Sequence, residues 1–128
     1  MIDTTGKSLQ QVSDAIAGKL IRQGGQCLDE DGNCAYGDGK GNHCAIGWLL
    51  SETSPLMNSG HTLSGLVETN SLEQEPNREF IIGNVGALFL IQSLHDSLLN
   101  RSGRCEKIAI IHDLNMDAWS EWVEMGDS

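Results

Sequence analysis

The sequence predicts a mainly α-helical single domain, and three features lead to this prediction. A chain of 128 residues has the usual length of one domain. Apolar residues recur at helical spacing in several separate segments. A glycine-rich stretch at residues 37–41 follows the first of these segments and is typical of tight turns. We therefore predict one compact domain over residues 1–128, with four or five helices and a small Gly-rich hairpin or loop after the first helix. An α+β arrangement stays open.

The first helix has the clearest start and stop signals. Ser8 and Gln11 form the S-x-x-Q pattern of a capping box, in which each side chain bonds the other residue's backbone N–H. Gly24 and Gly25 supply the stop. Between them the apolar positions follow helical spacing: Leu9, Val12, Ile16, Leu20 and Ile21.

A loop is predicted next, over residues 27–42, because it contains the turn pairs Asp31-Gly32 and the glycines of residues 37–41. A brief strand pair is expected around residues 34–36 and Cys44. Asn42 is predicted to cap a short helix over residues 44–50, which Ser54-Pro55 would end.

The middle of the chain alternates between polar and apolar stretches. A short helix is expected near residues 62–69, and residues 70–78 read as a polar loop. From Asn84 the run VGALFLIQSLHDSLL is apolar on most sides and predicts a central helix, ended by residues 100–103 (NRSG). Residues 107–112 (KIAIIH) fit either a strand or a helix.

The last predicted helix covers residues 113–126. Its apolar side would carry Met116, Ala118, Trp119, Trp122 and Val123. Its other side would carry a row of acidic residues one turn apart: Asp113, Asp117, Glu121 and Glu124. No Lys or Arg follows Lys107, so this acidic row has no local counter-charge, although like charges at this spacing repel each other.

The net charge of the chain indicates which kinds of binding partner to expect. Eighteen acidic residues against eight basic ones give a formal charge of −10. Binding of nucleic acid or of an anionic membrane needs clustered Lys and Arg, so neither is expected. No apolar run approaches the ~18 residues of a membrane span, and the N-terminal residues do not form a signal peptide. We expect a cytoplasmic protein that binds another protein.

Cys27, Cys34, His43 and Cys44 lie within one segment and carry the side chains that zinc prefers. Their spacing is longer than the short C-x2-4-C pattern, and the adjacency of His43 and Cys44 makes joint coordination awkward. We therefore expect no cofactor, with zinc at these four residues as the alternative. In a third interpretation Cys34 and Cys44 face inward as small apolar residues.

Two His-Asp doublets, His95-Asp96 and His112-Asp113, offer a different chemistry. Nucleophilic catalysis by a thiol needs a base beside the cysteine and a third group that orients the base. Cys34 or Cys44 together with one doublet would satisfy that requirement. The simpler interpretation is that these His and Asp residues cap helices or lie on the surface.

Several of these residues recur in one order that resembles a family of small uncharacterised phage and prophage proteins. The first part is a C-x-Y…G…C-A-x-G segment, carried by Cys34, Tyr36, Cys44, Ala45 and Gly47. The second part is an L-Q-x-x-H-D signal followed by a Trp, and it is carried by Gln92, His95, Asp96 and Trp119. Ile91 takes the place of the Leu. The doublet His112-Asp113 is an alternative match to the H-D of this signal. The resemblance implies a viral or mobile-element origin and implies no activity.

These observations lead to one main hypothesis and two alternatives. The main hypothesis is a phage-encoded acidic accessory protein without enzymatic activity, which binds a host protein through its negative surface and inhibits a nuclease or an anti-phage defence complex. The first alternative is a small metal-dependent or thiol enzyme that uses Cys34 or Cys44 with a His-Asp pair. The second is a structural protein whose cysteines are inert.

Overall fold

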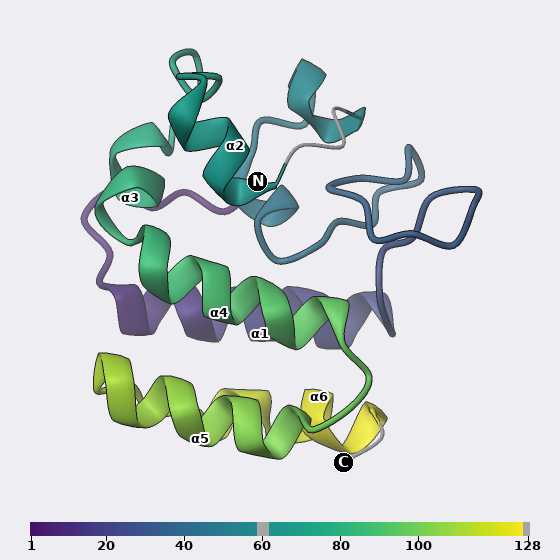
Figure 1. Ribbon diagram of the computed structural model, residues 1–128, viewed down its shortest axis with the longest axis vertical. Coiled ribbons are helices and arrows are strands. Elements are labelled where there is room, and N and C mark those ends of the chain that lie inside the picture. Colours follow the sequence, from purple (N-terminus) through teal and green to yellow (C-terminus); the bar gives the residue numbers. More distant parts are fainter. Residues whose placement is uncertain (59–61, 127–128) are drawn as a thin grey trace.

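A computed structural model describes residues 1–58 and 62–126 and confirms the mainly helical class. The α-helices of the described residues are α1 (Leu9–Gln23), α2 (Leu63–Glu68), α3 (Arg78–Gly83), α4 (Val85–Asp96), α5 (Arg101–His112) and α6 (Ser120–Met125). Short 3-10 helices lie at Gly47–Leu49, Pro55–Asn58 and Asp117–Trp119. Helices α1 and α4 cross the middle of the molecule, α5 and α6 lie on one side of them, and α2, α3 and the loops lie on the other (Figure 1).

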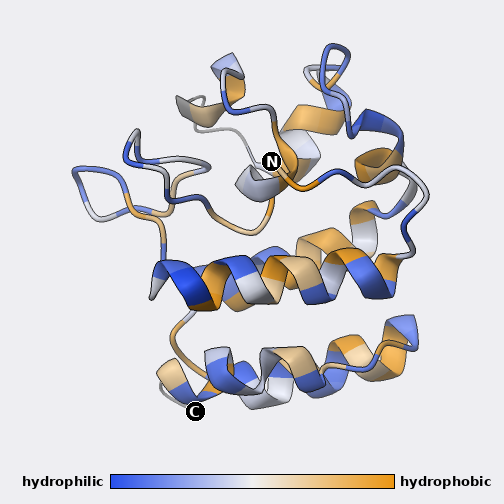
Figure 2. Cartoon of the chain, turned by 180° about the vertical axis from the view of Figure 1, so that it is seen from behind, coloured by the Kyte–Doolittle hydropathy of each residue, from blue (hydrophilic) through white to orange (hydrophobic). Residues whose placement is uncertain are grey.

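Helix α1 begins and ends where the sequence predicts. The Ser8 hydroxyl accepts the Gln11 N–H, and the Gln11 side chain accepts the Ser8 N–H, which completes the capping box. Gly24 closes the helix in the left-handed conformation at φ 89°. Hydrophobic and hydrophilic residues alternate along α1 (Figure 2), and its apolar side is buried in the core.

The loop after α1 forms two isolated antiparallel bridges, Leu28 with Cys34 and Gly37 with His43, instead of a longer hairpin. The predicted cap at Asn42 is wrong, because its side chain donates to the Asp38 carboxylate and holds the glycine turn. The short helix expected over residues 44–50 is a single 3-10 turn at Gly47–Leu49.

Gly47 explains why that turn is so tight. A Cβ at this position would lie against the Tyr36 carbonyl oxygen and 2.8 Å from the carbonyl carbon. The Gly47 N–H also donates to the Cys44 sulfur at 3.2 Å. The neighbouring Ala45 and Ile46 are fully buried. The C-A-x-G segment is therefore a close contact between two backbone segments, which only glycine permits.

The second half of the chain departs from prediction at three places. Helix α3 lies at the end of the stretch that was predicted to be a polar loop and just beyond it. Residues 100–103 begin α5 instead of ending α4, because Asn100 takes a left-handed conformation at φ 55° and reverses the chain. Residues 107–112, for which the sequence left strand and helix open, belong to α5 and are helical.

The predicted helix over residues 113–126 is the third and largest departure. Asp113 ends α5 in a left-handed conformation at φ 53°, and the chain becomes helical again only at Asp117. Between them Asn115 exchanges two hydrogen bonds with the Gln10 side chain on α1. The break lets the Trp119 and Trp122 side chains reach the core, where they are fully buried. Ala118, expected on the apolar side, is exposed.

The buried tryptophans and one buried arginine attach the C-terminal segment to the core. The indole N–H of Trp119 donates to the Ser13 hydroxyl at 3.0 Å, and the indole N–H of Trp122 donates to the Leu94 carbonyl at 2.8 Å. The Arg101 guanidinium lies 4.0 Å from the centre of the Trp122 ring and donates to the Trp122 carbonyl. Arg101 is 1 % exposed, so this cation–π contact is sheltered from water.

None of the described helices is long and apolar enough to cross a membrane.

The close contact at Gly47 predicts a large cost for adding one methyl group. We expect Gly47→Ala to lower the free energy of unfolding by about 1–3 kcal/mol, because the Tyr36 backbone has to shift to make room. Gly83→Ala is the matched control, since its Cβ would meet no atom within 4 Å. Urea unfolding of the variants measures both effects. Equal stability of the two variants would contradict the packing argument.

Candidate functional site

The glycine-rich loop and α4 enclose a pocket of about 410 Å³. Its walls come from the loop, from the segment around α2, and from one side of α4. The lining residues are Asp29, Cys34, Ala35, Tyr36, Gly37, Cys44, Met57, Thr62, Leu63, Phe89, Gln92, Ser93 and Asp96. Segments that are distant in the sequence therefore meet at one concave surface.

One face of α4 is kept free of the core and lines this pocket. Ala87, Leu88, Ile91, Leu94 and His95 are the buried residues of the helix. Phe89, Gln92, Ser93 and Asp96 follow at helical spacing on the pocket side. Phe89 is 57 % exposed, so the most apolar helix presents an aromatic ring that the core does not cover. Large apolar residues exposed beside a concave site are typical of ligand-binding surfaces.

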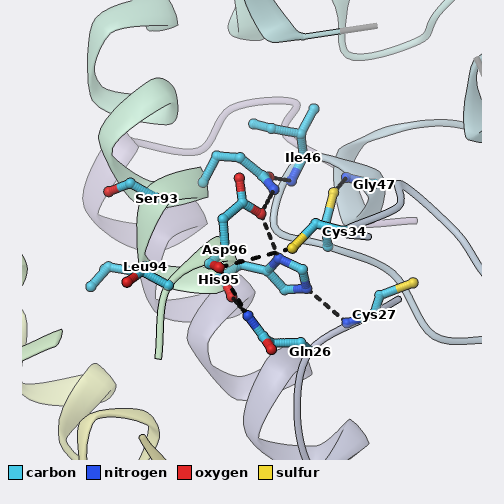
Figure 3. A network of polar contacts seen from close by, with 12 residues as sticks. Gln26, Cys27, Cys34, Ile46, Gly47, Ser93, Leu94, His95 and Asp96 are labelled. Atoms are coloured by element: carbon cyan, nitrogen blue, oxygen red, sulfur yellow. Dashed lines mark hydrogen bonds and ion pairs between the residues drawn. The ribbon is translucent and has the colours of Figure 1, made fainter. Parts of the chain in front are cut away.

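His95 fixes the position of the loop against the end of α4. Its Nε2 accepts the Cys27 N–H at 2.8 Å, and its Nδ1 lies 2.9 Å from Asp96 Oδ1 (Figure 3). The Gln26 amide donates to the carbonyl oxygens of His95 and Asp96, which satisfies the last two carbonyl groups of the helix. The His95 ring is fully buried.

These bonds also determine the tautomer of His95. A ring nitrogen that accepts a backbone N–H carries no proton, so Nε2 is the unprotonated nitrogen. The ring proton is then on Nδ1 and is donated to the Asp96 carboxylate. Neither nitrogen has a free lone pair. His95 is thus a structural bridge, and in this arrangement it is not available as a base for a neighbouring thiol.

Asp96 remains charged at the edge of the pocket. Burial opposes its ionisation, but hydrogen bonds from His95 and Gln92 outweigh that effect and hold the pKa of the carboxyl below its ordinary value. Both bonds use Oδ1. The Cys34 thiol also forms a side-chain hydrogen bond with this carboxylate. Oδ2 accepts no N–H among the described residues, so this oxygen of an oriented carboxylate can still receive a donor from a ligand.

The thiols of the site are protonated at neutral pH. Burial, followed by the negative charge of Asp96, raises the pKa of Cys34 to about 12, although this residue is exposed at the pocket. Burial raises the pKa of Cys44 to about 12 and that of Cys27 to about 11. All the cysteines are free. The expectation that both Cys34 and Cys44 face inward is correct for Cys44 and wrong for Cys34.

The four predicted zinc ligands do not converge in the described part of the chain. Both nitrogens of His43 face acceptors, the Tyr36 carbonyl and the Glu52 carboxylate, each at 3.1 Å. The Cys44 sulfur accepts the Gly47 N–H, and the Cys27 thiol donates to the Asn42 carbonyl. These four side chains are therefore occupied in separate contacts or directed to different places.

A different group of three possible ligands does meet: Cys34, His95 and Asp96, whose ligand atoms lie within 4.8 Å of one another. Coordination by His95 at Nδ1 would require moving its proton to Nε2, where the Cys27 N–H already points. The hydrogen bonds thus work against a metal ion at this group.

The structure brings together most of the residues that carry the family resemblance. Cys34, Tyr36, Cys44, Gln92 and Asp96 line the pocket, with His95 directly behind it. Ala45, Gly47 and Trp119 are packed in the core. His112 and Asp113 lie elsewhere, at the end of α5 near the first turn of α4, so the first doublet is the one at the pocket.

The acidic residues of the predicted row are all exposed, but they do not form a straight line on one helix. Asp113 ends α5, Asp117 begins a 3-10 turn, and Glu121 and Glu124 lie on α6. The turn at Asp113 breaks the regular helical spacing that the row requires. The geometric part of that prediction is wrong, while the exposure leaves the acidic surface available.

Sequence reasoning missed Gln26 and Phe89. Gln26 lies just after the glycines that end α1 and carries no recognisable signal. Phe89 was counted as one apolar residue of a central helix, and the amphipathic pattern of α4 is too weak to place it on the open side.

In comparisons with known proteins, no family model, no curated protein sequence and no solved structure matches this chain.

The raised pKa of Cys34 predicts slow alkylation despite its exposure. Because the thiolate is the reactive form, we expect iodoacetamide to react at pH 8 about a thousandfold more slowly than with free cysteine. The rate should rise about tenfold per pH unit up to about pH 11. Mass spectrometry of the wild type and of Cys34→Ser assigns the modified site. A rate that levels off below pH 8 would instead indicate an activated thiol.

Proposed function

We propose that this protein is a non-catalytic binding module whose site is the pocket between the glycine-rich loop and α4. The observation that supports this proposal is the convergence of Cys34, Tyr36, Gln92 and Asp96 on one concave surface. They come from two segments that are far apart in the sequence. A pocket with apolar walls and a few oriented polar groups is typical of a site for a small ligand or a side chain.

The state of the reactive groups favours binding over catalysis. The pKa of the Cys34 thiol is raised, whereas nucleophilic cysteines have a lowered pKa. The lone pair of His95 is engaged by the Cys27 N–H. A thiol or metal-dependent enzyme would need a Cys34 thiol with a lowered pKa and a His95 nitrogen with a free lone pair. The carboxylate of Asp96, by contrast, is charged and accessible, which suits recognition.

Filling the pocket tests this proposal. Ser93 lines the pocket from α4, so Ser93→Phe should occupy the space and leave the core unchanged. A fragment library screened by two-dimensional NMR should shift the amide signals of pocket residues in the wild type and lose those shifts in Ser93→Phe. Ser102→Phe on exposed α5 is the matched control and should keep them. Fragments that shift other surfaces equally in all three proteins would refute the site.

The uncompensated negative charge favours a second candidate function. No salt bridge among the described residues joins a Lys or Arg to an Asp or Glu. Asp113, Asp117, Glu121 and Glu124 are exposed on the C-terminal segment, and the formal charge of the chain is −10. Like charges left without partners raise the affinity for a basic surface. We therefore propose a phage-encoded accessory protein that acts in the host cytoplasm and binds a basic host protein, such as a nuclease or a defence complex.

Charge reversal of the C-terminal segment tests the second candidate. If this surface is the contact, Asp113→Lys, Asp117→Lys, Glu121→Lys and Glu124→Lys together should abolish capture of the host protein that the wild type retains at physiological salt. A control with reversed charge at Glu68, Glu73, Glu79 and Glu106 has the same net charge and exposed positions, and it should still bind. Equal loss in both variants would mean that only net charge matters. Capture by neither variant nor wild type would reject the candidate.

A further inference from the structure

The charged groups among the described residues of the pocket lining are acidic. These lining residues include two carboxylates, Asp29 and Asp96, and neither Lys nor Arg. The backbone N–H groups of Asp31 and Asn33 both bond to Asp29 Oδ1, so that side chain is held in place by its own turn. An anionic ligand would meet two like charges and no Lys or Arg among these described residues, and is therefore disfavoured.

Two carboxylate oxygens stand out among the polar atoms of the described lining. The Gln92 amide already donates to Asp96 and its oxygen accepts the Ile46 N–H. The Ser93 hydroxyl donates to the Leu90 carbonyl. Oδ2 of Asp96 and Oδ2 of Asp29, in contrast, accept no N–H from the described residues, although the Cys34 thiol also forms a hydrogen bond with the Asp96 carboxylate. A ligand that bonds to these two carboxylate oxygens must supply hydrogen-bond donors.

The rest of the pocket is apolar and includes an aromatic ring. Met57, Leu63 and Phe89 form this part of the lining. Because Phe89 is 57 % exposed, its ring is available to a flat group or a cation. Cations bind favourably over aromatic rings, and a charged ligand gains more from an oriented carboxylate than from a neutral acceptor.

We propose that the pocket binds an organic cation, namely a guanidinium, amidinium or ammonium group joined to an apolar body. The cationic group donates to Asp96 Oδ2, and the apolar body lies against Phe89 and Leu63. This inference rests on the proposed binding function and specifies the chemistry of the ligand. The same chemistry is found in a free small molecule and in an arginine or lysine side chain of a partner protein.

Three probes of nearly equal shape test the charge preference: benzamidine, which is cationic, benzamide, which is neutral, and benzoate, which is anionic. Each is titrated into the full chain and followed by two-dimensional NMR. We expect benzamidine to shift the amide signals of Gln92, Ser93 and Asp96, benzamide to bind at least about tenfold more weakly, and benzoate not to bind. Tighter binding of benzamide or benzoate would overturn the cation proposal while keeping the pocket as a binding site. Binding of none of the three would overturn the cation proposal, and the fragment screen would then decide whether the pocket binds at all.

Variants separate the carboxylate from general surface charge. Asp96→Asn keeps an oxygen for His95 and Gln92 but removes the charge, and it should weaken benzamidine binding at least about tenfold. Glu106→Gln on exposed α5 removes the same charge outside the pocket and should leave binding unchanged. If Asp96→Asn fails to fold, Phe89→Ala replaces an exposed side chain and should weaken benzamidine binding by severalfold. Unchanged affinity in the folded variant would overturn the proposal.

The source of the cation is distinguished with agmatine and with a short neutral-capped peptide that contains one arginine. Preference for agmatine would indicate a free small molecule, and preference for the peptide would indicate a partner's side chain. Either result supports the proposal. Failure of both to displace bound benzamidine would overturn the extension to natural guanidinium groups.

Discussion

The hydrogen bonds of His95 connect the two halves of this protein. The ring lies fully buried at the end of α4, receives the Cys27 backbone N–H from the loop after α1, and donates to Asp96. The Gln26 amide joins the same place by capping the last carbonyl groups of α4. A buried imidazole without these partners would be costly, so the loop and the helix are stable in one relative position. The pocket exists because this position is fixed.

The same bonds determine what the pocket can do. They leave Asp96 oriented and charged, with one oxygen accessible, while they occupy the histidine that a thiol would need as its base. Cys34 therefore lies beside a His-Asp pair without the electrostatic environment that activates a cysteine. The short distance between Cys34 and the His95-Asp96 pair would by itself suggest catalysis. The direction of each hydrogen bond favours recognition instead.

Charged side chains have different partners in the core and on the surface of this protein. In the core, the buried Arg101 guanidinium donates to carbonyl groups and lies over the Trp122 ring. On the surface the carboxylates of the described residues lack ion pairs with Lys or Arg. Both proposals call for a cationic ligand or partner, so they are compatible.

The sequence by itself determined the helical class, the bounds of α1 through its capping box and glycines, and the core of α4, because these depend on local patterns. It also singled out Cys34, Cys44, His95 and Asp96, but not which of them would meet. Tertiary contacts decided the rest. Asn115 and Gln10 form hydrogen bonds with each other across the fold, at the break in the chain before α6. The Cys27 N–H sets the tautomer of the His95 ring, although the two residues are 68 positions apart. Such partners are distant in the sequence, so no local periodicity encodes them.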